Sequence, residues 1–332
     1  MTTQETVSLH VRPATMDDVE AIVDVLNAAQ TADGGDPITS AEDAKREWED
    51  PMTNLTTDTF ILATAEGRVV AYGDVFDKRE PLTRVYHFGR VHPDFWGQGV
   101  GTRLLQILEE RAHQSIPKAP PHARIAFSSS VDNRCLGSAK LLQDNGYTLV
   151  RRYLQMRIEL NQVIPAPVVP EGITIRAFRP GEDDRPLFDA HSEAFQDHWG
   201  YQPMPYEQFE HHFYKGEKVD PAIYFLAVEG NQIAGYSLCL NEIPDDLDMG
   251  WIDLVGVRRP WRKKGVASAL LRASFLALQA RGKKRAGLGV DASSLTDATR
   301  VYTNVGMASH HEWHRYEKEI RAGEDLAVQT IE

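Results

Sequence analysis

The stretch Arg262-Lys263-Lys264-Gly265-Val266-Ala267 decides the fold, because it joins a strand to a helix. Residues 251–257 before it are mostly apolar, and apolar residues follow it at helical spacing: Leu270, Leu271, Phe275 and Leu278. This order predicts a strand, a short basic loop and a helix. Backbone N–H groups at a helix start are unpaired and partly positive, so they bind phosphate oxygens. Gly265 and Ala267 leave room for a phosphate, and the three cations before them add charge.

The chain contains a second, weaker copy of this unit. Residues 85–91 predict a strand, Trp96-Gly97-Gln98-Gly99-Val100-Gly101 predicts the loop, and Leu104, Leu105 and Leu108 predict one face of the helix. Other segments also recur in the same order: 60–73 with 224–236, and 139–147 with 299–307. A repeat this long indicates duplicated domains, since the repeats of a solenoid are far shorter.

Both halves resemble the GCN5-related N-acetyltransferase (GNAT) superfamily, and the whole chain resembles its tandem members. The superfamily's pyrophosphate loop has Arg or Gln, two free positions, Gly, one free position, and Gly or Ala, which Arg262 to Ala267 match. Val290-Asp291-Ala292-Ser293-Ser294, followed by Val301-Tyr302 and Gly306, resembles its second characteristic segment. The resemblance implies a mixed α/β fold with two tandem acyl-CoA N-acyltransferase domains, each a central mixed β-sheet flanked by helices.

Two departures from the superfamily pattern distinguish the halves. Trp96 stands where the first loop should have Arg or Gln, and Leu142 stands where the second half has Tyr302. The N-terminal half is therefore expected to be degenerate, with the chemistry in the C-terminal half. The expected organisation is an N-terminal domain at 1–160, a proline-rich linker at 161–172, a C-terminal domain at 173–320 and a polar tail at 321–332. Because such a linker is stiff, we expect a monomer with an internal pseudo-dimer.

The resemblance also implies that acetyl-CoA is the co-substrate. Its pantetheine arm would lie along residues 254–257, where backbone N–H groups of Val255 and Val257 would face it. We expect Gly256 to mark a β-bulge that leaves such groups free. Further donor-binding candidates come from the loop, the start of the helix and the second segment: Arg262, Lys263, Lys264, Gly265, Val266, Ala267, Ser268 and Ser294.

Acetyl transfer to an amine needs a neutral amine, a stabilised oxyanion and a proton for the departing thiolate. Tyr302 is the candidate general acid by resemblance, and a phenol stays protonated at neutral pH. The alternative is a core tyrosine whose hydroxyl is bonded locally. Asp253 is the candidate base, two residues before Val255. The alternatives are Glu242 as the base, a solvated carboxylate or surface ion pair at either position, or an amine that loses its proton to solvent before it binds.

The acceptor site is expected near residues 193–201, which combine aromatic, acidic and imidazole side chains. His198 and Trp199 are the substrate candidates there, with Glu242 on a strand end as a further one; a helix end capped by Trp199 is an equal interpretation of the segment. The tandem layout also resembles mycothiol synthases, which acetylate a cysteinyl amino-sugar. Trp251 stands where that subfamily is expected to have an acidic residue.

Composition limits the other functions. The 332 residues carry a formal net charge of -12, which argues against general nucleic-acid binding and leaves a small-molecule amine as the expected partner. Two cysteines in different halves, no long apolar run and no signal peptide predict a cytoplasmic protein that does not span a membrane. The histidines lack metal-ligand spacing, so no metal is expected. The competing function is a catalytically silent acyl-CoA sensor or interaction protein.

Overall fold

The computed structural model describes residues 8–35, 37–50, 52–78, 80–215, 219–243, 246–294 and 297–326. Two compact units divide the described chain. The N-terminal unit holds residues up to 151 together with 313–326, and the C-terminal unit holds residues 152–312.

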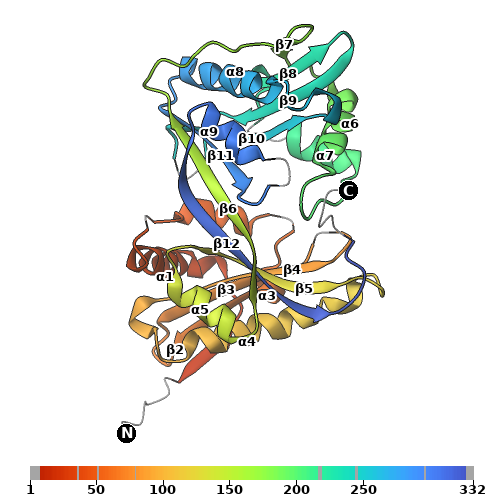
Figure 1. Cartoon of the computed structure of the whole chain (residues 1–332). Coiled ribbons are helices and arrows are strands. Elements are labelled where there is room, and N and C mark those ends of the chain that lie inside the picture. The colour runs from red at the N-terminus through yellow and green to blue at the C-terminus, as the bar shows by residue number, and fades with distance from the viewer. Residues whose placement is uncertain are drawn as a thin grey trace. The chain divides into compact units, whose positions relative to one another are not determined.

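A mixed sheet forms the centre of the N-terminal unit, as Figure 1 shows. Its strands run in the order β1-β2-β3-β4-β5-β12, with the β4–β5 pair parallel and the other pairs antiparallel. The strands are β1 Leu9–Arg12, β2 Thr59–Thr64, β3 Val69–Phe76, β4 Arg84–Val91, β5 Ile125–Asp132 and β12 Ala308–Arg321. The helices are α1 Val19–Ala32, α2 Ala41–Trp48, α3 Leu55–Asp58, α4 Val100–His113 and α5 Leu136–Asp144, with 3-10 turns at Met16–Asp18, Pro93–Phe95 and Ile116–Lys118.

The C-terminal unit repeats this plan. Its sheet order is β6-β11-β10-β9-β8-β7, and the β10–β11 pair is the parallel one. The strands are β6 Thr148–Glu159, β7 Thr174–Ala177, β8 Tyr224–Glu229, β9 Gln232–Leu240, β10 Met249–Val257 and β11 Arg285–Asp291. The helices are α6 Asp184–Phe195, α7 Tyr206–Phe213, α8 Val266–Ala280 and α9 Ala298–Asn304, with 3-10 turns at Pro221–Ile223 and Arg259–Trp261.

Helices cover both faces of each sheet, because neighbouring residues of a strand point to opposite sides. In β2, Ile61 packs in the cluster of α1 and α2, whereas Leu62 packs in the cluster of α4. Glycine lets α4 approach the sheet closely, since a Cβ at Gly89 would lie 2.9 Å from a Leu104 methyl group. The structure thus confirms the expected central mixed sheet flanked by helices. The alternating apolar pattern of the strands and the helical apolar pattern of the helices place these faces against one another.

Each sheet is completed by a strand from the other half of the sequence. Residues 313–321 of β12 pair antiparallel with β5, from Trp313 opposite Asp132 to Arg321 opposite Ile125. Residues 153–159 of β6 pair antiparallel with β11. In Figure 1 the blue end of β12 accordingly lies beside the yellow β5, and the yellow-green β6 lies beside the blue β11. The domain boundaries expected at residues 160 and 320 do not account for this exchange of β6 and β12.

The parallel pair at the centre of each sheet is short, and a wedge opens beyond it. β4 and β5 pair only over residues 84–86 and 126–128, and β10 and β11 only over residues 249–251 and 285–287. Beyond these positions the two strands diverge, so side chains and unpaired backbone groups face an open space. The pocket of each unit lies at this wedge.

The central strands of the two units differ by one inserted residue. β4 pairs with β3 without interruption. β10 pairs with β9 at Ile252–Cys239 and then at Leu254–Leu238, so Asp253 is the extra residue of a β-bulge. The bulge expected at Gly256 is therefore wrong. Gly256 stays in register opposite Tyr236, and its missing side chain makes room for that ring, because a Cβ would lie 2.6 Å from the Tyr236 hydroxyl oxygen.

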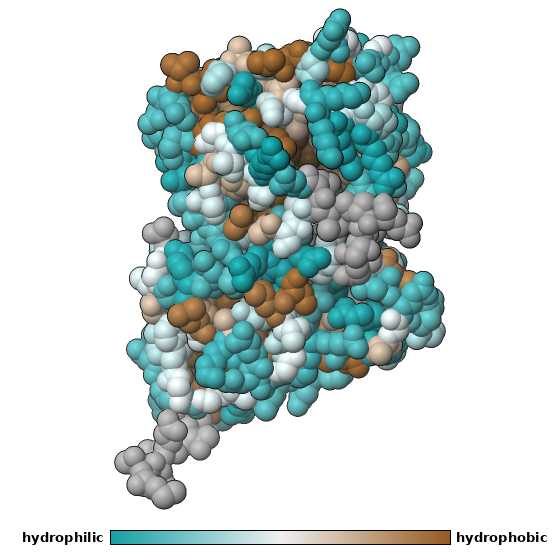
Figure 2. All heavy atoms as spheres, viewed as in Figure 1, coloured by the Kyte–Doolittle hydropathy of each residue, from teal (hydrophilic) through white to brown (hydrophobic). Residues whose placement is uncertain are grey.

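Hydrophilic side chains occupy most of the face that Figure 2 shows, with smaller hydrophobic groups between them. In the part of the chain that the structure describes, no helix has the length and apolarity needed to cross a bilayer. The same residues contain no group of three or more His, Cys, Asp or Glu side chains placed to hold a metal ion. Cys135 and Cys239 are buried free thiols.

Candidate active site

The loop before the central helix has the backbone geometry of an anion-binding nest in both units. Lys263 (φ 61°) and Gly265 (φ 86°) are left-handed before α8, and Gly97 (φ 70°) and Gly99 (φ 80°) are left-handed before α4. Such a loop turns successive N–H groups toward one point, next to the positive end of the helix dipole. A left-handed backbone costs a residue with a side chain about 1–2 kcal/mol, so the N-terminal loop adopts it more easily than the C-terminal loop.

The residue that opens each loop ties it to the end of the preceding strand. Arg262 Nε donates to the carbonyl of Val257 at 3.1 Å, and Trp96 Nε1 donates to the carbonyl of Val91 at 2.7 Å. Trp96 therefore makes the same strand contact with an indole, although it departs from the superfamily pattern.

The remaining contacts of Arg262 also lie within the protein. Its Nη1 donates to Asp197 at 2.6 Å and its Nη2 to the carbonyl of Ala194 at 3.0 Å. Arg259 donates to both oxygens of the Asp197 carboxylate, one of which it shares with Arg262, and the Asp197 side chain is only 3% exposed. These bonds, chiefly the one from Arg259, lower the pKa of Asp197 to about 2. The sequence analysis did not assign Asp197 a role; its only signal was an acidic residue next to His198.

The other loop residues divide into exposed cations and helix-start backbone. Lys263, Lys264 and Gly265 are exposed, and among the described residues no carboxylate forms an ion pair with either lysine. Val266 is 2% exposed and packs in the core, so it can offer a ligand only its backbone. Ala267 and Ser268 are half-buried in the first turn of α8. The loop thus presents two free ammonium groups around a row of helix-start N–H groups.

The pocket of the C-terminal unit has a volume of about 210 Å³ at the wedge between β10 and β11. It brings together six of the predicted site residues: Asp253, Val255, Tyr302, Ser294, His198 and Trp199. Val257, Glu242 and the residues of the 262–267 loop do not line it. Glu242 instead accepts a hydrogen bond from Lys283 at 2.8 Å.

Tyr302 projects from α9 into this pocket and is 8% exposed. Burial raises the pKa of its phenol to about 12. No described residue forms a hydrogen bond with its hydroxyl, which removes the main support for a structural role with a locally bonded hydroxyl. The phenol is thus protonated at neutral pH and has its hydrogen available for a ligand.

Asp253 opens into the same pocket from the bulge of β10, and its side chain is exposed. The protein around it still limits its hydration, which raises the pKa of the carboxyl above its usual value, and the charge of His212 opposes this shift. A carboxylate with a raised pKa is a better proton acceptor than an ordinary aspartate.

An aromatic wall closes the pocket on the side of α6. The Phe195 ring lies between His191 and His198, with ring centroids 4.5 and 4.2 Å apart. His191 forms a 2.8 Å hydrogen bond with the Tyr236 hydroxyl, and burial lowers its pKa to about 4. Burial also lowers the pKa of His198. These imidazoles are therefore neutral at pH 7, and the wall does not repel a cationic acceptor.

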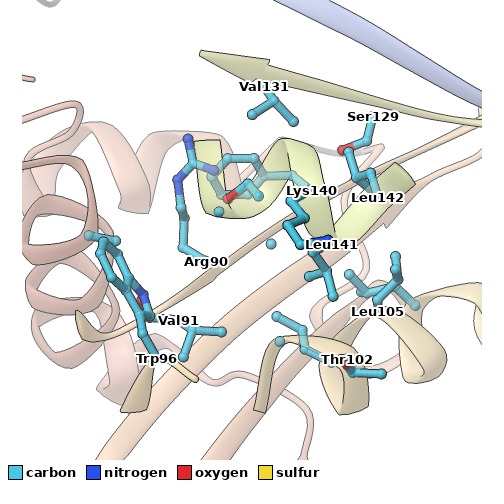
Figure 3. Close-up of a pocket in the computed structure, with 18 of the residues that line it drawn as sticks. Arg90, Val91, Trp96, Thr102, Leu105, Ser129, Val131, Lys140, Leu141 and Leu142 are labelled. Atoms are coloured by element: carbon cyan, nitrogen blue, oxygen red, sulfur yellow. The ribbon is translucent and has the colours of Figure 1, made fainter. Parts of the chain in front are cut away.

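The N-terminal unit has a larger pocket, of about 580 Å³, at the wedge between β4 and β5. It runs from Gly97 and Thr102 at the loop and α4 to Ala29 on α1. Figure 3 shows labelled lining side chains from β4, β5, α4 and α5, among them Arg90, Thr102 and Leu142. Leu142 lies at the position that corresponds to Tyr302 and has no proton to give. Arg90, 8% exposed, was not predicted; its only signal was a cation inside a strand of mixed apolar and basic residues.

The comparison with protein families assigns the chain to a class. The acetyltransferase (GNAT) family matches residues 22–120 and 185–307, one match in each unit. The chain therefore belongs to the GNAT family of acetyltransferases, as the sequence analysis predicted, and is an acyltransferase of the kind that uses acyl-CoA.

Similar proteins share the tandem arrangement. The mycothiol acetyltransferase of Thermobispora bispora is 27% identical over 318 residues, which cover 91% of this chain and 96% of the relative. That of Salinispora arenicola is 30% identical over 88% of this chain and 91% of the relative. The crystal structure of a GCN5-related N-acetyltransferase from Sphaerobacter thermophilus has a TM-score of 0.85 at 36% identity, over 96% of this chain and 98% of that one. A tandem GNAT protein from the clavulanic acid biosynthesis pathway shares the fold, with a TM-score of 0.66 at 16% identity and coverage of 96% and 100%.

Proposed function

We propose that the chain transfers an acetyl group from acetyl-CoA to a primary amine, with the chemistry in the C-terminal unit. The observation that carries this proposal is the meeting of Asp253, Val255 and Tyr302 in one pocket at the β10–β11 wedge. The bulge that supplies Asp253 has no counterpart in β4, and the N-terminal unit has Leu142 in place of the phenol. These differences favour the C-terminal unit as the site of transfer.

The donor would bind along the wedge. The nest before α8 and the ammonium groups of Lys263 and Lys264 would hold the pyrophosphate. The pantetheine arm would run between the diverging strands, where a backbone N–H near Val255 could bond the thioester carbonyl. Because β10 and β11 no longer pair there, their facing backbone groups are available to the arm.

The transfer itself is a direct attack. The amine nitrogen forms a bond to the thioester carbonyl carbon, and the carbon–sulfur bond breaks when the tetrahedral intermediate collapses. Asp253 accepts the proton that the amine loses, directly or through a water molecule. Tyr302 gives its proton to the departing thiolate, and solvent exchange then returns each group to its starting state. The products are the N-acetylated amine and free CoA.

The first test replaces Tyr302 with Phe, which removes only the hydroxyl. General acid catalysis contributes about 10²- to 10⁴-fold, so we expect kcat to fall by about 100-fold while the donor Kd is unchanged. The matched control is Tyr214→Phe in the same unit, whose hydroxyl donates to the Asp184 carbonyl at 2.8 Å, outside the pocket. Equal kcat for the Tyr302→Phe and wild-type proteins at saturating donor would remove Tyr302 from the mechanism.

The acceptor class follows from the relatives and the pocket wall. The relatives are named mycothiol acetyltransferases, so the cysteinyl amino-sugar of that class belongs in the acceptor panel beside small amines. Trp251 supplies no acidic side chain; it packs against Gly287, where a Cβ would lie 2.9 Å from the Trp251 ring. Asp253 is therefore the carboxylate that would meet an acceptor ammonium group.

The N-terminal unit fits the second candidate function, acyl-CoA binding without chemistry. Its loop has left-handed Gly97 and Gly99 and a Trp96 contact that replaces the one made by Arg262. Its wedge pocket has room for a pantetheine arm. Leu142 in place of a phenol leaves the unit without the proposed acid, so we infer that it binds the donor but does not transfer the acetyl group.

A further inference from the structure

The N-terminal pocket contains a buried cation that forms no ion pair with any carboxylate of the described residues. Arg90 is 8% exposed and lines the pocket from β4. Its Nε has no hydrogen-bond partner, its Nη2 contacts the Cys135 sulfur at 3.6 Å, and its guanidinium lies 5.3 Å from the centre of the Phe88 ring. Figure 3 shows this side chain extending toward the same side of the pocket as Val131 and away from Trp96 and Thr102.

Asp33 and Asp132 lie near Cys135 at this end of the pocket, and neither carboxylate forms an ion pair with Arg90. Among the described residues no carboxylate forms an ion pair with it. Asp33 lines the pocket but is not paired with Arg90, and Asp132 accepts hydrogen bonds from Gln30 and Arg134. Burial raises the pKa of the Cys135 thiol to about 12, although Arg90 opposes this shift, so the thiol stays neutral at pH 7.

The C-terminal unit shows that the fold does not need this arginine. Arg90 pairs with Tyr72 of β3, and the residue in the same register of β10 is Gly256, which pairs with Tyr236 of β9. There the tyrosine ring fills the space over the glycine and bonds His191. In the N-terminal unit Tyr72 is instead bonded by Trp48, and Arg90 occupies the face toward the pocket.

A buried guanidinium without a counter-ion is costly, whereas a carboxylate satisfies it with two parallel, charge-assisted hydrogen bonds. We propose that the N-terminal pocket binds a small ligand that carries a carboxylate, and that Arg90 receives this carboxylate at the end of the pocket near α1. The other end, at Gly97, Gly99 and Thr102, is the anion-binding loop already described.

The carboxylate has two possible sources. It is carried either by a free small acid or by the acyl chain of a CoA thioester, because Arg90 lies in the same pocket as the proposed donor loop. The two sources share the contact with Arg90 and differ in whether the CoA moiety is needed for binding. The proposal does not depend on catalysis in the C-terminal unit.

The experiment measures ligand binding to the full-length Gly265→Glu variant, in which the C-terminal loop is blocked. Calorimetry compares succinate with the neutral succinamide, and succinyl-CoA with acetyl-CoA. Each pair is measured again with Arg90→Met added, and with Lys140→Met as the matched control. Lys140 is a cation on the same pocket, but it is exposed and pairs with Asp144 at 2.9 Å.

We expect the carboxylate member of at least one pair to bind more tightly, and Arg90→Met to abolish this preference by weakening its binding about 10- to 100-fold. Lys140→Met keeps the preference. A preference in the succinate pair identifies a free acid, and one only in the succinyl-CoA pair identifies an acyl chain. Without ligand, Arg90→Met has an equal or higher Tm, because an unpaired buried charge has been removed.

Three results would overturn the proposal. The first is equal binding of succinate and succinamide together with equal binding of succinyl-CoA and acetyl-CoA. If acetyl-CoA still binds in that case, only the carboxylate site is contradicted, and the proposed donor site of the N-terminal unit is kept. The second is a preference that persists in Arg90→Met. The third result applies if Arg90→Met does not fold. Arg90→Lys then replaces it, because lysine keeps the charge without the planar fork of the guanidinium. A folded Arg90→Lys protein with undiminished carboxylate preference would contradict recognition by the guanidinium.

Discussion

Two carboxylates of one pocket have their pKa values moved in opposite directions by their neighbours. Asp197 accepts hydrogen bonds from Arg259 and Arg262, which hold its pKa at about 2. Asp253 has an exposed side chain with no arginine bonded to it, and the protein around it limits its hydration enough to raise its pKa. Asp197 is therefore an anion at neutral pH that holds the loop, and the raised pKa of Asp253 agrees with its proposed role as the proton acceptor.

The pH dependence of turnover tests the role of Asp253. A general base must be ionised, so kcat should fall as the pH drops through the raised pKa of Asp253, above the usual aspartate value of about 3.9. Because the pKa of Tyr302 is about 12, its protonated form persists to well above neutral pH and adds no loss there. The measurement is log kcat against pH for one acceptor at saturating substrates.

Asp253→Asn should lower kcat and remove the acidic limb of this profile. The control is Asp248→Asn, an exposed carboxylate that pairs with Lys284 at 2.7 Å, away from the pocket. An unchanged acidic limb in Asp253→Asn would mean that another group, or the free amine itself, produces it.

At the scale of elements, the end of α6 and the loop before α8 are held together by one buried carboxylate. Asp197 follows α6 directly and receives Arg259 from the 3-10 turn and Arg262 from the loop. The carbonyl of Ala194 accepts a further bond from Arg262. This contact connects the aromatic wall, which includes Phe195 and His198, with the proposed pyrophosphate loop.

Asp197→Asn should therefore loosen the loop more than it affects chemistry. We expect the donor Kd to rise by about three- to tenfold with little change in kcat, and Tm to fall, because two arginines lose their charged partner. Arg262→Gln should raise the donor Kd by a similar factor. The double variant should raise it by less than the two single effects combined, because both substitutions remove the same contact between Asp197 and Arg262. The control is Glu193→Gln on α6, which loses the ion pair with Arg258.

The same ion pairs give the stability of this region a pH dependence. The pKa of Asp197 is lower in the folded chain than in the unfolded one, so its contribution is complete above about pH 4 and is lost as the pH falls toward 2. If the effects of Asp197→Asn and Arg262→Gln add in the double variant, or if Asp197→Asn leaves the donor Kd unchanged, Asp197 does not hold the loop in the way described.

For the whole molecule, the exchange of strands makes the folding of the N-terminal unit depend on the last part of the chain. Residues 313–321 cover the edge of β5. They supply Glu317, which is 3% exposed and accepts a bond from Arg84 Nε at 2.5 Å, and Lys318, which pairs with Glu109 at 2.9 Å. Removing one partner of a buried ion pair costs about 3–5 kcal/mol, which approaches the whole stability of a domain of this size.

A fragment of residues 1–151 should thus fail to unfold cooperatively on heating. Joining residues 308–326 to it through a flexible Gly/Ser linker should restore a sharp transition, because β5 regains its partner strand. Circular dichroism and calorimetry measure both. The linked fragment with Glu317→Gln is the matched variant and should have a lower Tm than its parent. A sharp transition in the fragment without residues 308–326 would show that the exchanged strand is dispensable.

Much of the candidate site could be predicted from the local spacing of residues in the sequence. The strand, loop and helix around Arg262 could be predicted because each pattern lies within about 20 residues and follows the period of its element. Resemblance nominated Tyr302, and its side chain lines the pocket of the C-terminal unit. Asp253 could be nominated but not explained, since the bulge that presents it exists only in the pairing of β10 with β9. The bulge was placed at Gly256 instead, because the Tyr236 ring that needs this glycine belongs to another strand.

By itself the sequence determined that two GNAT units follow one another, where the loops before α4 and α8 lie, and that the first unit has Leu142 where the second has Tyr302, because these properties depend on residue type and local period. Tertiary structure alone decided that β6 and β12 each complete the sheet of the other half, and that Asp197 joins α6 to the loop. It also buried Arg90 without an ion pair to any carboxylate of the described residues. These features arise from strand register and from contacts between distant segments, and the local pattern of a sequence does not encode which distant segment a side chain will meet.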